Sequence, residues 1–284
     1  MFIFVMLFGC SQEGSNHLTE LMEDSAQLDG FDVAVELIPR GIFQMGCTEG
    51  DDNCADNEYP AHTVEITRDF YMMQMEVTQS LYESVMGENP SEFVLGTDFP
   101  VEEVNWFDAV RFANALNDLE NRERCYEWVQ DEAGETSVIW SGLECTGWRM
   151  PTEAEWEYAA RGGEDFVYAG SDLLDEIAWY EDNADDQSHE VGLKKSNGFG
   201  LYDMSGNVEE WCWDGYESNI YQTYADLGTV QDPSGAESSS DRVLRGGGWG
   251  LPPRFTRVSN RIFVSAVSVR RIFGFRLVRT SDIN

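Results

Sequence analysis

Histidine, lysine and long apolar runs are scarce in this chain of 284 residues. The three histidines lie far apart, at positions 17, 62 and 189, which argues against a serine-histidine-aspartate triad and against a non-haem iron centre. The two lysines, Lys194 and Lys195, do not follow the glycines of a P-loop. No run approaches the ~20 apolar residues that a membrane-spanning helix needs. The sequence thus gives no sign of these enzyme classes or of a membrane span.

Positive charge is also scarce, because 18 Lys and Arg stand against 53 Asp and Glu, a formal net charge of −35. This balance excludes nucleic acid as a partner, since phosphates need basic side chains. Residues 242–284 are the exception, with nine arginines and one acid, Asp282. We expect these arginines either to form ion pairs with the acidic remainder or, for a few, to line a pocket for an anionic or polar ligand.

The apolar N-terminus, residues 1–10 (MFIFVMLFGC), resembles a bacterial lipoprotein signal in which Cys10 is lipidated. It departs from that pattern because no basic residue precedes the apolar run and the run is short. An ordinary apolar N-terminus is the alternative. Residues 11–36 are polar and acidic, as expected of a flexible tether. We expect a protein of the bacterial cell envelope, periplasmic or surface-exposed, that contacts the membrane through this lipid anchor only.

Five further cysteines would be exposed to oxidation in an exported protein. Four of them allow three pairings, and we predict the disulfides Cys47–Cys54 and Cys125–Cys145, each of which flanks a polar segment. Cys212, between two tryptophans, is predicted to be a buried thiol. A zinc site is the alternative, although the chain has no CxxC spacing to support it.

Periodicity and capping residues predict several elements of a mixed α and β fold. Helices are expected at Gln79–Met86 after an N-cap Thr78, from Asn105 onward, and from Thr152 onward, the last two with capping-box spacing to Asp108 and Glu155. Strands are expected at Phe43–Gly46, Thr63–Arg68, Phe70–Val77 and Phe275–Arg279. No repeat of 20–50 residues is present, so a solenoid is not expected.

A set of short motifs occurs in order along the chain. The longest are Trp148–Arg161 (WRMPTEAEWEYAAR) and Gly200–Trp211 (GLYDMSGNVEEW); the others are Phe43–Gly46, Pro60–Val64, Glu76–Thr78, Pro100–Trp106, Arg245–Trp249 and Gly274–Leu277. Together they resemble the formylglycine-generating enzyme, or sulfatase-modifying factor, family. The resemblance implies a single compact α+β domain over residues 37–280, related to C-type lectins, with little regular secondary structure and long ordered loops.

The resemblance also bears on catalysis. Active family members oxidise a substrate cysteine to formylglycine with two C-terminal cysteines that hold copper(I), a soft ion that favours thiolates. The corresponding positions here, after the Gly246–Trp249 turn and at the start of the Thr256–Arg261 run, are Leu251 and Thr256. Neither side chain supplies a thiolate. We therefore expect no formylglycine-generating activity and no bound copper.

Calcium is the metal that the sequence favours, because Ca²⁺ takes carboxylate, amide and carbonyl oxygens. Family members bind a structural calcium ion at positions that match Asn207, Val208 and Glu210. The resemblance therefore implies a structural calcium site at these residues. A hydrogen-bonded turn without metal is the alternative.

Two functions remain open. The first is a non-catalytic binding or accessory domain whose ligand site is formed by aromatic and arginine side chains of the C-terminal segment, namely Trp249, Arg254, Phe255, Thr256, Arg257 and Arg261. Its ligand would be a peptide, a protein or a small anionic or sugar-like molecule. The second is an oxidoreductase of the same family that uses different residues or a different metal.

Overall fold

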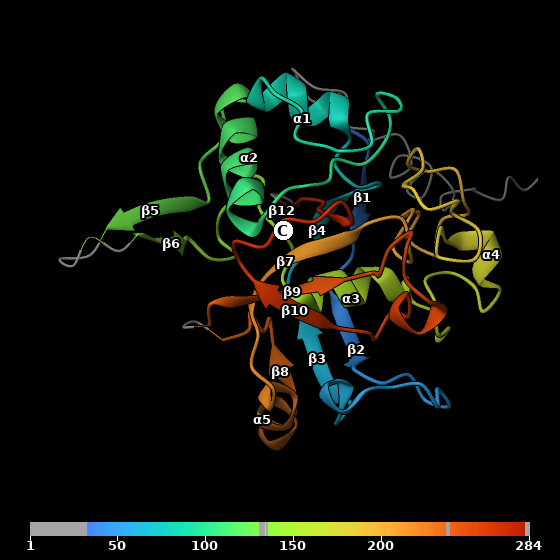
Figure 1. Ribbon diagram of the computed structural model, residues 1–284. Helices are drawn as coiled ribbons and strands as arrows, with labels where there is room; N and C mark the ends of the chain where they lie inside the picture. Colours follow the sequence, from blue (N-terminus) through green and yellow to red (C-terminus); the bar gives the residue numbers. More distant parts are fainter. Residues whose placement is uncertain (1–32, 131–133, 135, 237–238, 282–284) are drawn as a thin grey trace, which may run out of the picture.

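The computed structural model describes residues 33–130, 134, 136–236 and 239–281. Its helices are short and its strands span two to seven residues, with long loops between them (Figure 1). The helices are α1 Gln79–Met86, α2 Trp106–Leu119, α3 Glu153–Arg161, α4 Leu174–Ile177 and α5 Ile220–Leu227. The strands are β1 Val35–Ile38, β2 Gly41–Met45, β3 His62–Ile66, β4 Phe70–Met73, β5 Tyr126–Gln130, β6 Thr136–Trp140, β7 Glu209–Gly215, β8 Val230–Gln231, β9 Asp241–Arg245, β10 Ile262–Ser265, β11 Phe273–Gly274 and β12 Val278–Thr280.

The strands form four small sheets, with the orders β1-β4-β12, β10-β9-β7-β11, β2-β3-β8 and β5-β6. The first sheet joins the two ends of the domain, because β4 pairs with both β1 and β12. In the second sheet, β9 pairs antiparallel with β7, and α3 packs on both strands. This arrangement places the arginine-rich segment beside the two longest motifs of the sequence.

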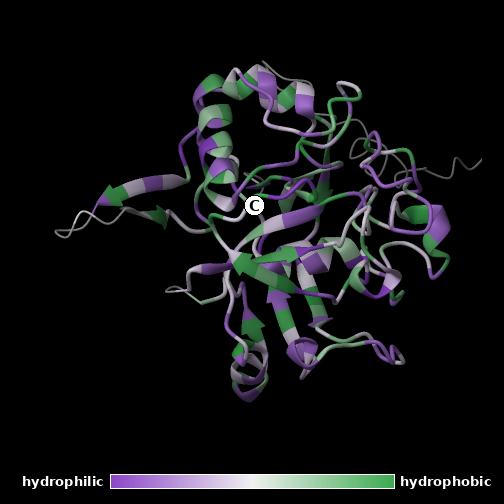
Figure 2. Cartoon of the chain, in the orientation of Figure 1, coloured by the Kyte–Doolittle hydropathy of each residue, from purple (hydrophilic) through white to green (hydrophobic). Residues whose placement is uncertain are grey.

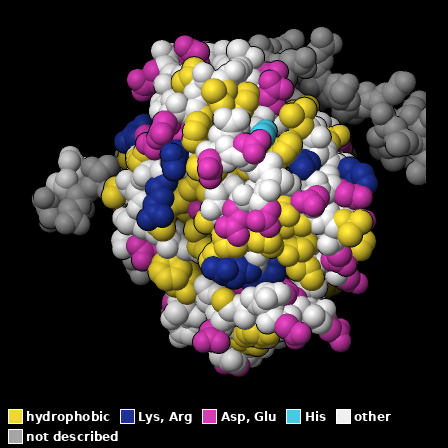
Figure 3. Space-filling view, turned by 45° about the vertical axis from the view of Figure 1, so that its right-hand side comes forward, with side chains coloured by type: hydrophobic (Ala, Val, Ile, Leu, Met, Phe, Trp, Pro, Cys, Tyr) yellow, Lys and Arg dark blue, Asp and Glu magenta, His cyan; other side chains and the backbone are white. Residues whose placement is uncertain are grey.

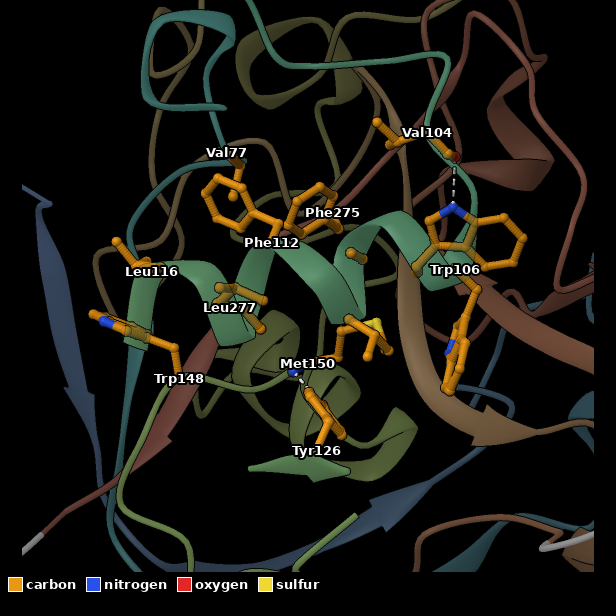
Figure 4. Close-up of a cluster of buried hydrophobic side chains, with 14 of the residues drawn as sticks. Val77, Val104, Trp106, Phe112, Leu116, Tyr126, Trp148, Met150, Phe275 and Leu277 are labelled. Carbon is orange, nitrogen blue, oxygen red and sulfur yellow. Dashed lines mark hydrogen bonds between the residues drawn. The ribbon is translucent and has the colours of Figure 1, made fainter. Parts of the chain in front are cut away.

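The larger hydrophobic core lies between α2 and the C-terminal segment (Figure 4). Trp106, Phe112 and Leu116 of α2 are fully buried, and the Phe112 ring lies 5.2 Å from that of Phe275. Hydrophobic and hydrophilic residues share α2, as its amphipathic pattern predicts (Figure 2). The core holds this single mixed α and β domain together, in agreement with the predicted fold class.

The three helix starts predicted from capping residues are confirmed. The Thr78 hydroxyl accepts the Leu81 amide, at 3.3 Å, and α1 has the predicted bounds. Asn105 and Thr152 cap α2 and α3, and in both helices the predicted capping box is complete. These signals are local, because a capping side chain contacts backbone groups only two or three residues away.

Several strand boundaries differ from the prediction. β4 ends at Met73 instead of Val77, and the last strand is Val278–Thr280 instead of Phe275–Arg279. β1 begins at Val35, so the folded domain includes two residues assigned to the tether. In each case the strand covers only the residues that find a pairing partner in β4 or its neighbours. The protruding β5-β6 hairpin in Figure 1 was not predicted.

Both predicted disulfides are confirmed. Cys47 pairs with Cys54 and Cys125 with Cys145, whose bond closes the base of the β5-β6 hairpin. Cys212 is a free and fully buried thiol, as expected. The disulfides indicate an extracytoplasmic protein. Within the described residues, no helix is long and apolar enough to cross a membrane. Cys10, residues 1–10 and most of the predicted tether lie outside the described part of the chain.

Candidate functional site

Arg245 lies at the centre of a buried network of charges. Its guanidinium lies 2.5 Å from Glu157, and neither side chain is exposed. The same guanidinium donates to the carbonyls of Val258, Ser259 and Asn260 and so fixes the following loop on β9. This arginine therefore acts as a structural anchor beneath the surface.

Arg261 and Arg257 occupy similar buried positions. Arg261 forms a bidentate pair with Glu153, at 2.7 and 2.5 Å. Arg257 pairs with Asp51, in the loop closed by the Cys47–Cys54 disulfide, and with Glu58, which follows that loop. Burial alone would raise the pKa of Glu58, but the hydrogen bond from Arg257 lowers it overall. The interpretation of the C-terminal arginines as ion-pair partners is thus correct for these two residues.

The six predicted ligand residues are therefore not brought into one pocket. Arg257, Arg261 and Thr256 are buried, and the Thr256 hydroxyl donates to the Pro253 carbonyl at 2.9 Å. The sequence predicted that these three residues bind a ligand. The structure argues against this role, because other groups of the protein already accept the hydrogen bonds that they donate. Arg254 is exposed and lies over the Phe255 ring, 4.4 Å from its centroid.

Trp249 lines a cavity of about 520 Å³ with a different set of residues. Its indole nitrogen donates to the Arg271 carbonyl, and the Arg271 guanidinium lies 5.2 Å from the Trp249 ring centroid. Arg270 and Val269 are exposed at the same cavity. The residues that line it are Glu103, Asp186, Trp249, Gly250, Val269, Arg270, Arg271 and Ile272. Arginine and aromatic groups do meet here, although the sequence motifs pointed to other arginines.

Two positions align with the family cysteines, Leu251 and Thr256. Both follow the lining residue Gly250 within six positions in the sequence, but their surroundings differ. Leu251 is half-buried, and its carbonyl accepts the Glu181 amide at 3.1 Å. Thr256 is fully buried. Four of the five cysteines in the described residues form disulfides, which leaves Cys212. Burial raises the pKa of the Cys212 thiol well above its ordinary value.

The predicted calcium ligands are held by protein groups. Both Glu210 oxygens accept from Arg276, at 2.7 Å, and one also accepts from the Trp156 indole. The Asn207 amide bridges the His189 backbone and the Glu76 carboxylate. Because the side chains of Glu210 and Asn207 are already paired, these two residues do not fit a calcium ion as they lie. Among the described residues, no group of three or more His, Cys, Asp or Glu side chains has a metal-binding arrangement.

Several carboxyl groups near these residues are buried and, among the described residues, form no ion pair within 4.0 Å. Burial raises the pKa of Glu209 to about 8, although the charge of Arg270 lowers it in part. Burial also raises the pKa of Asp203 to about 6 and that of Glu76 well above its ordinary value. A carboxyl with the raised pKa of Glu209 therefore mostly keeps its proton at neutral pH, whereas Asp203 mostly releases it.

Comparison with known proteins explains the shared architecture. Residues 28–281 match the sulfatase-modifying factor enzyme 1-like domain. The chain belongs to this family. It is 38% identical over 210 residues to the chaperone protein LppX of Paenibacillus barcinonensis, covering 64% of this chain and 69% of that protein. It is 29% identical over 293 residues to the formylglycine-generating enzyme of Streptomyces coelicolor, covering 87% and 89%.

Solved structures share the fold of this sulfatase-modifying factor domain. The variable protein 1 of Treponema denticola superposes with a TM-score of 0.77 at 33% identity, over 88% of this chain and 95% of that protein. The family resemblance inferred from motifs is thus confirmed. The cavity residues Arg270 and Arg271 carried no motif, and the only sequence signal for them was their place in the arginine-rich segment.

Proposed function

We propose that this protein is a non-catalytic binding or accessory module of the bacterial cell envelope. One observation carries the proposal. Among the described residues, Cys212 is the only cysteine outside a disulfide, and it is fully buried. The family's oxidation needs a pair of thiolates for copper(I). The leucine and threonine at the aligned positions, Leu251 and Thr256, cannot provide it. The name of the LppX relative, a chaperone, supports an accessory role.

The binding surface in this proposal is the cavity beside Trp249. Arg270 and Arg271 supply directional donors, and Trp249 with Ile272 supplies apolar area, a combination common in recognition sites. Arg271 has a distant ion-pair partner, Glu92 at 3.6 Å, and both side chains are more than half exposed. A surface pair of this kind is weak, so Arg271 can exchange its partner for an anionic ligand group.

Two measurements test the proposal. Oxygen consumption with a cysteine-containing sulfatase peptide and added copper(I) should stay at background, and turnover would favour the alternative of an oxidoreductase with different chemistry. Calorimetric titration with galacturonate, an anionic sugar, should give binding heat that is absent with neutral galactose and lost in R270S/R271S. The matched control R122S/R124S removes the same charge at a distant surface and should bind normally. Equal loss in both variants would reject the assigned surface.

Anchoring through Cys10 belongs to the same proposal. A lipid on this residue would hold the domain at a membrane surface without any membrane-spanning segment. Cells grown with a palmitate analogue should label the wild-type protein and not C10S. Labelling of C10S, or release of the wild-type protein in soluble form, would contradict the anchor and leave the binding role untouched.

A further inference from the structure

We propose a second ligand site, in the cavity between β2 and the C-terminal end of α3, that takes an arginine side chain of a peptide or protein partner. The cavity has a volume of about 700 Å³, within the usual range of ligand pockets. Its walls come from β2 and the loop after it, from α3, and from the turn that follows α3. It is separate from the cavity beside Trp249 and shares no lining residue with it.

One wall of this cavity is aromatic. Phe43 of β2 and Tyr158 of α3 are both half-buried, with ring centroids 5.2 Å apart. Tyr158 also contacts Phe199 edge to face, at 5.7 Å, which fixes its ring. Partly exposed aromatic faces attract cations, and the flat guanidinium of arginine stacks on them more readily than a strongly hydrated ammonium does.

The rim of the cavity is acidic. Glu49 comes from the loop after β2, and Glu164 and Asp165 come from the turn after α3. None of the three has an ion-pair partner in the described part of the chain. The Glu164 Oε2 atom is buried and lacks a hydrogen-bond partner there. This oxygen packs against Gly198, so a bound guanidinium would pair instead with the exposed carboxylates of the rim, such as Glu49 and Asp165.

The one basic residue at the cavity does not cancel these charges. The Arg161 side chain is 10% exposed and turns inward, where it pairs with the fully buried Glu157. Its guanidinium also donates to the Gly46 carbonyl and the Thr48 hydroxyl. The cavity also lies at the C-terminal end of α3, where the helix dipole favours positive charge. The net field at the cavity therefore selects a cationic ligand.

Acidic groups elsewhere on the surface also attract cations, so the cavity needs a feature that the rest of the surface lacks. Acidic side chains are spread over the face shown in Figure 3, whereas basic side chains gather in a few clusters. A basic peptide will therefore approach many parts of this protein. The aromatic wall formed by Phe43 and Tyr158 distinguishes the cavity from an ordinary acidic surface.

Fluorescence anisotropy with a labelled Ala-Arg-Ala peptide tests the site on the whole protein. The peptide should bind the wild type about tenfold more tightly than its citrulline counterpart, which keeps the shape and loses the charge, a difference of about 1.4 kcal/mol. E164Q/D165N should weaken the arginine peptide about tenfold or more. The matched control E217Q/D226N removes two exposed acids near α5 and should leave binding unchanged.

The proposal is overturned by equal binding of the citrulline peptide, by equal loss in the control variant, or by no binding of the arginine peptide at all. Y158L provides a second test, since it should weaken binding of the arginine peptide while leaving the three acids of the rim in place. Circular dichroism confirms that each variant is folded. Free arginine amide should compete for the site if the side chain alone is recognised, and a failure to compete would assign recognition to the peptide backbone and reject the proposal.

Discussion

Glu157 joins two arginines from different parts of the chain inside the protein. One of its oxygens lies 2.7 Å from Arg161 on the same helix, and the other lies 2.5 Å from Arg245 on β9. The first oxygen also accepts the Gly46 amide. The carboxylate thereby connects α3, β9 and the loop after β2. Because Glu157 is fully buried, water cannot take over its hydrogen bonds to the two arginines.

E157Q should destabilise the protein strongly. The substitution removes the nearest carboxylate of both Arg245 and Arg161 and leaves Arg245 only the more distant Glu153, at 3.6 Å. Breaking a buried pair in this way costs about 3–5 kcal/mol. Urea unfolding followed by tryptophan fluorescence measures the change. E144Q removes the partner of Arg68 in an exposed pair and should cost less than about 1 kcal/mol. Equal losses in the two variants would contradict the central role of Glu157.

Glu209 should make stability depend on pH. Its folded pKa of about 8 lies above its ordinary value of 4.5, so between these pH values the folded state holds a proton that the unfolded chain has released. The free energy of unfolding should therefore fall as pH rises through this window, by up to ~1.4 kcal/mol per pH unit. E209Q should flatten the dependence relative to wild type in urea titrations from pH 5 to 8. The exposed acid Glu217 is the control, and an unchanged slope in E209Q would contradict this assignment.

Removal of calcium should leave the domain unaffected. Arg276 and Trp156 already occupy the Glu210 oxygens, so the turn is held by hydrogen bonds alone. The melting temperature should be the same with calcium and with a chelator. A higher melting temperature in calcium that is lost in N207A would restore the calcium site inferred from the family.

The Cys125–Cys145 disulfide should contribute substantially to stability. The two residues are 20 positions apart, and closing a loop of this length in the unfolded chain is worth about 3 kcal/mol. C125S/C145S should lose about this free energy of unfolding in urea. Wild-type protein in a reducing agent should also lose at least this much, since both of its disulfides open. A variant as stable as the oxidised wild type would show that the hairpin base needs no covalent closure.

Local signals in the sequence predicted local structure well. Thr78, Asn105 and Thr152 each cap a helix as expected, because a cap depends on residues two or three positions away. Strand ends were less predictable. β4 and β12 end where their pairing ends, and that depends on segments about 200 residues apart.

The candidate site was predicted only in part. Family motifs led to Trp249, which lines a cavity and whose role in binding stays a prediction, but they could not tell buried arginines from exposed ones. Arg257 and Arg261 face acids that are distant in sequence, Glu58 and Glu153, and only the fold brings them together. Because acidic residues are so abundant in this chain, the sequence alone could not show which arginines form buried ion pairs.

The pairing of β12 with β4 has a consequence for how the protein is made. The sheet that closes the domain needs a strand from its final residues, Val278–Thr280, and Arg276 must reach Glu210 from the same stretch. The domain therefore cannot close before this segment has been synthesised. A chain that stays open for so long is suited to translocation in an extended form, with folding completed on the far side of the membrane.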